Sequence, residues 1–169
     1  MSELIYREGD LFADLPLIKM DTVVAHVVSD TGAFGAGFAA GVATHHPVVK
    51  HQYQSSYQGY ALGDIQYCYA GEINSFTLEF ANLFAQHGLR SKTNIQPLSY
   101  AHLQTTLWDL AQILSYEEDP IQVWAPKLGC GLGGGSWPRI EEIINKTLVA
   151  ADVRTVIYSL PTPGVSAAA

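Results

Sequence analysis

The chain has 169 residues, 48% of them hydrophobic, and carries a formal net charge of −7. This length lets one domain bury a core, and the acidic balance argues against nonspecific binding to nucleic acid or to acidic membranes. We expect a cytoplasmic protein, because the apolar runs are shorter than the ~20 residues of a membrane span and residues 1–6 lack the basic-then-apolar order of a signal peptide.

Hydrophobic runs divided by glycine and proline predict alternating strands and helices. In chain order, we expect a strand at 5–12, a strand at 22–28, a helix ending near 43, a helix at 48–57, strands at 62–69 and 77–84, a helix at 97–115, a strand at 121–125, a helix at 137–148 and a strand at 155–160. Residues 22–28 form a β-branched run, which is typical of a strand buried on both faces. Residues 71–74 suit a hairpin turn between the third and fourth strands.

Both long helices carry an apolar face. Leucines recur at three- and four-residue steps between 97 and 115, which places Pro97 in the first turn of that helix. Isoleucines and a leucine recur in the same way from Ile140 to Leu148, and Ser136 is the expected N-cap.

The order of these elements predicts an α/β fold. βαβ-like units with an inserted hairpin give a three-layer α/β/α sandwich around a central mixed sheet of about six strands. We expect a single domain over 1–160 and a flexible tail over 161–169. Ligands of such sheets lie outside the carboxyl ends of the strands, so two glycine loops that follow buried strands are expected to line one crevice.

The two glycine loops are residues 29–37 and 129–135. Each precedes a helix, whose first N–H groups and dipole favour an anion, and glycine lets a ligand approach the bare main chain. The alternative is a pair of ordinary tight turns with close helix packing. Because both loops follow neighbouring buried strands, the pattern favours a phosphate-containing ligand, which local N–H dipoles must hold since the net charge repels it.

Three other interpretations of the second loop are weaker. Gly129, Gly131 and Gly134 match a dinucleotide fingerprint, but only one strand follows where further βαβ units are needed. The glycines are not followed by the Lys-Ser/Thr pair of a P-loop. Cys130 suits a buried thiol better than a phosphatase nucleophile, because the next arginine is Arg139 inside the following helix.

Histidines and cysteines do not predict a metal site. The three histidines within 45–51 have no matching carboxylate or cysteine spacing, so a solvated surface is the preferred interpretation. The two cysteines have no zinc-type spacing and fit a reducing compartment. His26 is expected to be a satisfied core residue, and we expect neither a metal nor a cofactor.

With both loops in view, the chain resembles a macrodomain, the ADP-ribose-binding α/β/α module, over nearly its whole length. The likeness rests on residues 25–30, on Gly-Ala-Gly at 35–37, and on 128–132 with Trp137 at the helix start. It is greatest to the branch that contains the terminal ADP-ribose protein glycohydrolase, the chromatin-remodeller macrodomain and bacterial proteins labelled as ADP-ribose-1''-phosphate processing. The resemblance implies ADP-ribose, ADP-ribosylated proteins and ADP-ribosylated nucleic-acid ends as partners; we expect a monomer without a membrane partner.

The resemblance also implies which residues touch the ligand. Asp10 would accept a hydrogen bond from the adenine amino group, and the second glycine loop would wrap the diphosphate through its N–H groups. The first glycine loop would surround the distal ribose with Phe34 nearby, and Tyr158 to Pro161 would wall the adenine side. The implied contacts are Asp10, Leu11, Ser29, Thr31, Gly32, Ala33, Phe34, Gly35, Ala36, Gly37, Gly129, Cys130, Gly131, Leu132, Gly133, Gly134, Gly135, Tyr158, Leu160 and Pro161.

Two departures from the glycohydrolase shape the expected chemistry. That enzyme uses a lysine at the end of the hairpin strand, where this chain has Gln86 or His87, and an aspartate in the second glycine loop, where it has Gly133. A lysine-linked intermediate is therefore not expected, and water must attack directly. An ester to glutamate or aspartate is the easiest bond to break in that way, because carboxylate is a good leaving group. The candidates to orient the water are Ser29, Asp30, Gln86 and His87.

Several functions stay open at this point. A hydrolase that removes mono-ADP-ribose from acidic side chains without a metal comes first, and a phosphatase acting on ADP-ribose 1''-phosphate is a related option. A reader that binds ADP-ribose without turnover is favoured by the two missing charges, and a nicotinamide enzyme is the remaining alternative. As a check, Gly134→Glu is expected to place a carboxylate in the diphosphate site without unfolding the chain.

Overall fold

A computed structural model describes residues 2–161. Its centre is one mixed sheet of six strands in the order β1-β6-β5-β2-β4-β3. The strands are β1 Leu4–Glu8, β2 Thr22–Ser29, β3 Ile65–Ile73, β4 Phe76–Gln86, β5 Gln122–Pro126 and β6 Thr155–Ser159. The helices are α1 Leu11–Asp14, α2 Phe38–His45, α3 Pro47–Ser56, α4 Tyr100–Ser115 and α5 Trp137–Ile144, with 3-10 turns at Leu15–Leu17 and Tyr57–Gly59 and a π-helical turn at Asn145–Val149. Every helix within residues 2–161 is too short or too polar to cross a membrane.

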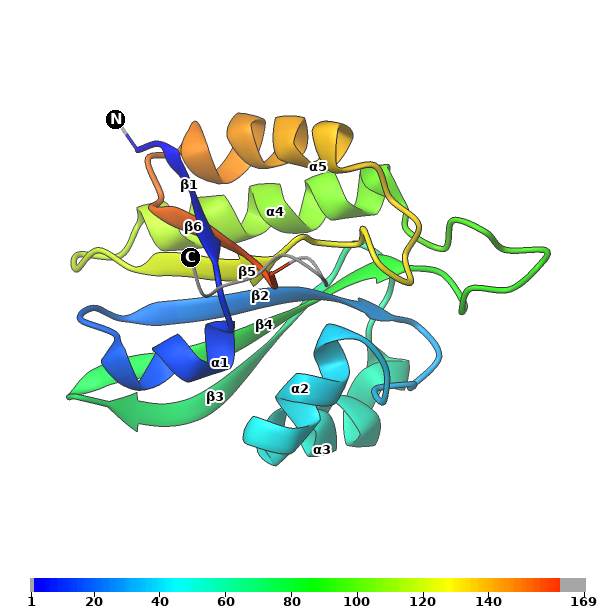
Figure 1. Ribbon diagram of the computed structural model, residues 1–169, viewed down its shortest axis with the longest axis horizontal. Coiled ribbons are helices and arrows are strands. Elements are labelled where there is room, and N and C mark those ends of the chain that lie inside the picture. Colours follow the sequence, from blue (N-terminus) through cyan, green and yellow to red (C-terminus); the bar gives the residue numbers. More distant parts are fainter. Residues whose placement is uncertain (1, 162–169) are drawn as a thin grey trace.

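Helices cover both faces of the sheet (Figure 1). α4 and α5 lie on one face, and α1, α2 and α3 lie on the other. The leucines of α4 and the isoleucines of α5 are buried against the first face. Aromatic side chains, among them Tyr53, Phe80 and Phe84, fill the second interface. The predicted three-layer sandwich around six strands is confirmed.

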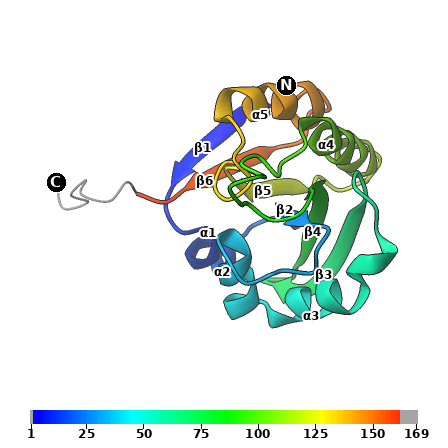
Figure 2. The ribbon, with the colours of Figure 1, turned by 90° about the vertical axis from the view of Figure 1, so that its right-hand side faces the viewer.

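Strand β2 sets the layout of the sheet. It pairs in parallel with β4 on one side and with β5 on the other, and all of its eight residues except Val27 are buried. The β-branched composition predicted this burial. Because β2, β4 and β5 run in the same direction, their carboxyl ends meet at one edge of the sheet. The loops at 30–37, 87–99 and 127–136 leave from that edge, which faces the viewer in Figure 2.

A buried chain of hydrogen bonds crosses the sheet from β2 to α3. Asn82 Nδ2 donates to Gln66 Oε1 over 3.1 Å, so Asn82 Oδ1 is free to accept from His26 Nε2 over 2.6 Å. Gln66 Nε2 donates to Ser56 Oγ over 2.7 Å. The three side chains on the strands are at most 1% exposed, and buried polar groups of this kind are stable only when paired. The prediction of His26 as a satisfied core residue is confirmed, and burial lowers its pKa to about 4.

The hairpin between β3 and β4 turns later than predicted. Its tip is at Asn74 and Ser75, which both have positive φ, rather than at 71–74. β3 continues past a register shift next to Gly71, where φ is +115°, so this glycine serves an irregularity within the strand. The glycine was a misleading turn signal because it marks a bulge.

The starts of the two long helices also differ in detail from the prediction. Pro97 precedes α4 instead of lying in its first turn, because Ser99 is the N-cap and its side chain accepts from the His102 N–H. Ser136 does precede α5, but within residues 2–161 its side chain makes no capping hydrogen bond. Of the predicted tail, residues 162–169 lie outside the described residues, and the single-domain extent stays a prediction.

The burial of His26 predicts a specific pH dependence of stability. The folded chain keeps this imidazole neutral down to about pH 4, whereas the unfolded chain protonates it below about 6.5. Its stabilising contribution is therefore complete above pH 6.5 and is lost as the pH falls, by about 3 kcal/mol at pH 4. His26→Gln keeps a neutral donor toward Asn82 and lacks this titration. Between pH 7 and pH 4, urea unfolding should therefore show wild type losing about 3 kcal/mol more unfolding free energy than the variant.

The matched control is His51→Gln, which changes an exposed histidine and should reproduce the wild-type pH dependence. Parallel pH profiles for wild type and His26→Gln would contradict a neutral buried imidazole.

Candidate functional site

A cavity of about 620 Å³ opens at the carboxyl ends of β2 and β5. Its walls come from the first glycine loop, the second glycine loop and the segment after β4. The ribbons of these three loops lie on the side of the molecule that faces the viewer in Figure 2. The lining residues are His26, Val27, Val28, Ser29, 33–39, Gln86, Leu89, Arg90, 126–129 and 131–133. Two loops that lie about one hundred positions apart in the sequence thus share one site, as the parallel pairing of β2 and β5 requires.

The second glycine loop folds on itself and leaves three N–H groups open. Gly135 N–H donates to Gly129 O over 2.8 Å, and Gly134 N–H donates to Gly131 O over 3.1 Å. Gly129 and Gly134 have φ of +66° and +71°, where glycine is favoured. Among the described residues, none accepts from the N–H groups of residues 131–133, which line the cavity. Such a turn presents open donors to an anionic ligand.

Close backbone contacts decide which glycines of this loop tolerate a side chain. A Cβ at Gly134 would lie 2.4 Å from Ile95 O, and at Gly133 it would lie 2.6 Å from Gly129 O. At Gly131 a Cβ would meet nothing within 4 Å. The expectation that Gly134→Glu leaves the fold intact is therefore wrong, because the added atom collides with the main chain of a neighbouring loop. Gly131 is the position at which the loop accepts a substitution.

Two cations at the cavity were missed in the sequence. Lys127 directly follows β5, and its Nζ lies 5.6 Å from the centroid of the Trp137 ring. Arg90 lies in the segment after β4, and its Nη1 donates to Gly131 O over 3.4 Å. The expectation that N–H dipoles alone would meet a phosphate is corrected, because two positive charges line the same cavity. The available signal was the position of Lys127 at the carboxyl end of a buried strand.

The four candidate catalytic residues form two pairs. Ser29 and Gln86 line the cavity and are paired across β2 and β4. Asp30 and His87 lie beyond the lining, where His87 Nδ1 and Asp30 Oδ2 are 2.6 Å apart. Ser29 Oγ hydrogen-bonds Thr31 Oγ1 over 2.7 Å, and Gln86 Nε2 donates to Gly88 O over 3.2 Å. Only the first pair can reach a molecule in the cavity directly.

Asp30 fastens the segment after β4 to the first glycine loop. Its Oδ1 accepts from the Gly88 N–H over 2.9 Å, in addition to the contact with His87. Partial burial would raise the pKa of this carboxyl, but the hydrogen bonds from Gly88 and His87 outweigh it and hold the pKa below its usual value. Asp30 is therefore an ionised anchor between two loops of the site.

Tyr53, which sequence reasoning did not single out, supports the first glycine loop from below. It is fully buried on α3, its hydroxyl donates to Ser29 O over 2.6 Å, and the same oxygen accepts from the Gly32 N–H over 3.1 Å. Burial raises the pKa of this phenol, so the hydroxyl keeps its proton. The residue fixes the backbone on both sides of Asp30.

Comparisons with known proteins agree on the fold. No protein-family model matches the chain, and no curated protein does. A protein of unknown function from Bacteroides thetaiotaomicron superimposes with a TM-score of 0.79 at 27% identity, over 93% of this chain and 98% of its own. A macrodomain protein from Streptomyces coelicolor gives a TM-score of 0.74 at 26% identity, over 93% of this chain and 99% of its own. The chain has the macrodomain fold.

The macrodomain is also similar to a larger protein solved with a ligand. Thermosipho africanus DarTG, in complex with ADP-ribose, superimposes with a TM-score of 0.74 at 21% identity, over 95% of this chain and 42% of that one. At this identity the likeness concerns the fold alone. The recognition of a macrodomain in the sequence is confirmed, whereas the assignment to a branch of the family stays a prediction.

The structure brings most, but not all, of the implied loop contacts into the cavity of the macrodomain. From the first loop, Ser29 and 33–37 line it, while Thr31 and Gly32 are not part of the lining. From the second loop, three residues are not part of the lining. These residues are Cys130, Gly134 and Gly135. Burial raises the pKa of the half-buried Cys130 thiol, which fits a thiol without a nucleophilic role.

The residues implied on the adenine side lie outside the cavity lining. They are Asp10, Leu11, Tyr158, Leu160 and Pro161. Asp10 and Leu11 follow β1, Tyr158 is near the end of β6, and Leu160 and Pro161 follow it. β6 is the neighbour of β5 in the sheet, and β1 is the neighbour of β6. Asp10 Oδ1 accepts from the Phe12 N–H and caps α1, while the buried Tyr158 donates to Asp14 Oδ2 over 2.9 Å. Their part in ligand binding stays a prediction.

The histidines at 45–51 have neighbours other than a metal. The His45 ring stacks on Phe12 with centroids 4.7 Å apart, and the half-buried His46 ring lies 5.0 Å from Phe80. No group of three or more metal-ligating side chains is found within the described part of the chain. His46 is less solvated than predicted, because it packs on the aromatic layer beneath α2.

The anchoring role of Asp30 gives a test. Asp30→Ala removes the acceptor of the Gly88 N–H and leaves that group without its partner, which costs about 1–3 kcal/mol of unfolding free energy. Hydrogen exchange at the Gly88 N–H should be faster in Asp30→Ala than in wild type. Asp30→Asn keeps a neutral acceptor, so its exchange rate at Gly88 should lie between those of Asp30→Ala and wild type.

Asp119→Ala removes an exposed carboxylate outside the site and serves as the control. Unchanged exchange at Gly88 in Asp30→Ala would contradict the anchor.

Proposed function

We propose that this macrodomain binds ADP-ribose in the cavity between its two glycine loops. One observation carries the proposal: the open N–H groups of residues 131–133 and the cations of Arg90 and Lys127 face the same cavity, within an otherwise acidic chain. A diphosphate needs both, since N–H donors fix its oxygens and fixed cations offset its charge. The complex of the similar Thermosipho africanus DarTG with ADP-ribose supports the same ligand.

The orientation of the ligand follows from the two loops. The diphosphate lies along 129–135, and the distal ribose lies in the first glycine loop against Phe34, which is 2% exposed and lines the cavity. The adenine extends toward Asp10 and Tyr158 at the ends of β1 and β6. In this proposed orientation the anomeric carbon lies nearest to Ser29 and Gln86, which are paired where β2 and β4 end.

We further propose that the macrodomain hydrolyses the ester between ADP-ribose and glutamate or aspartate side chains, without a metal. Water adds to the anomeric carbon, the bond to the ester oxygen breaks, and the products are free ADP-ribose, a carboxylate and a proton. The carboxylate leaves without a general acid, so the chain needs only to orient water and ribose. Ser29 and Gln86 are placed to touch the water, with Asp30 and His87 holding the segment beside them.

The second loop of this macrodomain has no room for a catalytic aspartate at 133. A Cβ there would lie 2.6 Å from Gly129 O, so the glycine is needed for the turn itself. This observation favours a second candidate, a reader that binds ADP-ribose without cleaving it. A phosphatase acting on ADP-ribose 1''-phosphate is the remaining option, and release of inorganic phosphate from that compound distinguishes it.

Binding is tested at Gly131, where a side chain fits. Gly131→Glu directs a carboxylate into the site of the diphosphate, and like charges in contact cost several kcal/mol, so the affinity for ADP-ribose should fall about 100-fold or more. Gly131→Gln introduces a side chain of the same size as glutamate without its charge, so it should lose far less affinity for ADP-ribose. Calorimetry with ADP-ribose measures both.

Equal affinities of Gly131→Glu and wild type, or equal losses in the two variants, would contradict the placement of the diphosphate.

Catalysis is tested with a protein that carries mono-ADP-ribose on glutamate. We expect release of free ADP-ribose, unchanged by EDTA, and no release from an arginine-linked substrate, whose leaving group needs protonation. Ser29→Ala or Gln86→Ala should lower the rate by about 100-fold while keeping the affinity for ADP-ribose, as loss of a group that orients water does. Tight binding of ADP-ribose without cleavage of any ADP-ribosyl linkage would favour the second candidate, a module that binds ADP-ribose without cleaving it.

A further inference from the structure

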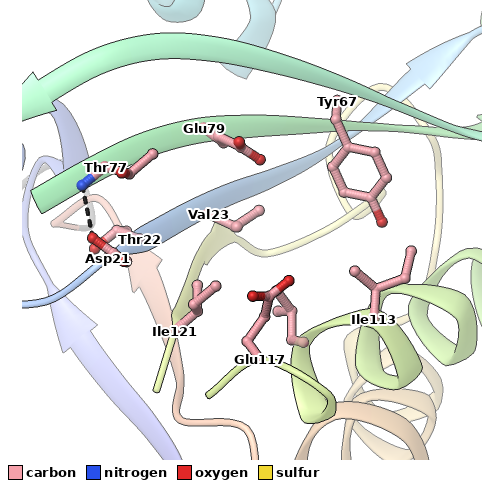
Figure 3. Close-up of a pocket in the computed structure, with 10 residues that line it drawn as sticks. Asp21, Thr22, Val23, Tyr67, Thr77, Glu79, Ile113, Glu117 and Ile121 are labelled. Carbon is pink, nitrogen blue, oxygen red and sulfur yellow. Dashed lines mark hydrogen bonds between the residues drawn. The ribbon is translucent and has the colours of Figure 1, made fainter. Parts of the chain in front are cut away.

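A second hollow lies on the far side of the molecule from the glycine loops. It has a volume of about 280 Å³ and is formed between β2, β4 and the end of α4 (Figure 3). A neighbouring hollow of about 470 Å³ continues along α4 and β3, and Tyr67 and Ile113 line both. Together the two hollows form a groove between α4 and the edge strand of the sheet, called here the acidic groove.

Carboxylates line the acidic groove, and none of the lining residues within 2–161 is basic. Asp21, Glu79 and Glu117 line the first hollow, and Asp64 and Asp109 line the second. The sequence has no lysine or arginine in 51–89 or in 93–126, the stretches that supply β3, β4 and α4. The lining residues of the two hollows therefore contribute carboxylates whose charge no lining lysine or arginine offsets. A cation is the ligand that such a field favours.

Two of the carboxylates are directed into the same space. Figure 3 shows the Glu79 side chain entering from β4 and the Glu117 side chain entering from the end of α4, on opposite sides of the hollow. Asp21 is different, because its Oδ1 already accepts from the Thr77 N–H over 2.7 Å. Glu79 and Glu117 are thus the acceptors available to a molecule in the hollow.

An unpaired hydroxyl lies in the wall of the same groove. The oxygen of Tyr67 is buried and, among the described residues, has no hydrogen-bond partner. Figure 3 shows it directed toward Ile113, at the junction of the two hollows. Burial and the negative charges of Asp109 and Glu79 raise the pKa of this phenol to about 12, so it stays protonated. A buried hydroxyl without a partner is costly, and a donor group bound in the groove would satisfy it.

An exposed hydrophobic side chain lines the groove, since Ile113 is 46% exposed and belongs to both hollows. Outside the lining, Trp108 on the same helix and Tyr116, its C-cap, are 54% and 84% exposed. The floor of the first hollow is apolar, with Val23 and Ile121. A metal ion or a small hydrated cation would leave these surfaces uncovered. A longer molecule that combines cationic and apolar groups covers both.

We propose that the acidic groove docks a basic polypeptide segment of another protein, with an arginine side chain in the hollow between Glu79 and Glu117. The planar guanidinium carries five donors, pairs with carboxylates in a bidentate manner and stacks on aromatic rings, so one side chain reaches both carboxylates and the Tyr67 hydroxyl. Lysine offers a point charge without the planar face. The apolar neighbours of the arginine in the segment cover Ile113 and Trp108.

The test uses a fluorescein-labelled peptide, Gly-Ala-Arg-Leu-Arg-Ala-Gly, and the same peptide with citrulline in place of both arginines. Fluorescence anisotropy should show binding of the arginine peptide that weakens with added salt, and about tenfold weaker binding of the citrulline peptide, as expected for loss of charge-assisted hydrogen bonds. Glu79→Gln combined with Glu117→Gln should weaken the arginine peptide by a similar factor.

The matched control is Glu3→Gln combined with Glu8→Gln, which removes the same charge from the residue before β1 and from its last residue, at the other edge of the sheet. It should leave the affinity within about twofold, because separated surface charges are screened by salt. If both double variants lost the same affinity for the arginine peptide, the proposal would be overturned, because the peptide would then be attracted by the overall negative charge of the chain and not by the groove. Equal binding of arginine amide and of the peptide would overturn docking of a segment in favour of a small-cation site.

Tyr67→Phe distinguishes a change in peptide binding at the groove from a change in the stability of the fold. It removes only the unpaired hydroxyl, so the melting temperature should stay the same or rise, while the affinity for the arginine peptide should fall about threefold, as for one lost hydrogen bond. Unchanged affinity would overturn the contact between the guanidinium and the Tyr67 hydroxyl. Binding of ADP-ribose, at the other end of the sheet, should stay the same in all of these variants.

Discussion

The parallel pairing of β2 with both β4 and β5 is the constraint on which the rest of the macrodomain depends. It brings three carboxyl ends to one edge of the sheet, so every loop that leaves there must share the same space. The register shift after Val28 sharpens this effect, because it pairs Ser29 with Gln86 and skips Ala85. The two side chains that reach the cavity from the strand ends are therefore neighbours by sheet geometry.

The loops at that edge are then fastened to one another rather than left independent. Asp30 accepts from the Gly88 N–H, and Arg90 donates to Gly131 O, so the segment after β4 contacts both glycine loops. Leu98 N–H donates to Gly133 O over 3.1 Å from the end of the same segment. Hydrogen bonds of this kind hold the open N–H groups of the second loop in place before a ligand arrives, which reduces the entropy lost on binding.

The order of the elements and the layers could be predicted from the sequence, because burial leaves a periodic signal. The β-branched run of β2 and the leucine spacing of α4 depend only on which faces meet the core. Local details were less predictable. Gly71 looked like a turn residue but serves a bulge, and the fit of a side chain at Gly131 but not at Gly134 depends on Ile95 O, which belongs to a different loop. Contacts between distant segments leave no local pattern.

The local distribution of charge also depends on contacts between distant segments, so the sequence alone did not predict it. The net charge of −7 describes the chain as a whole, yet the two cations Arg90 and Lys127 line the cavity. The stretches 51–89 and 93–126, which supply most of the groove, contain no lysine or arginine. At physiological salt, charges more than about 8 Å apart are largely screened, so a ligand responds to the charges that line its own site. The sheet separates the two regions because its strands carry the loops to one edge and the acidic ends of β4 and α4 toward the other. One fold can thereby attract an anion at one end and a cation at the other.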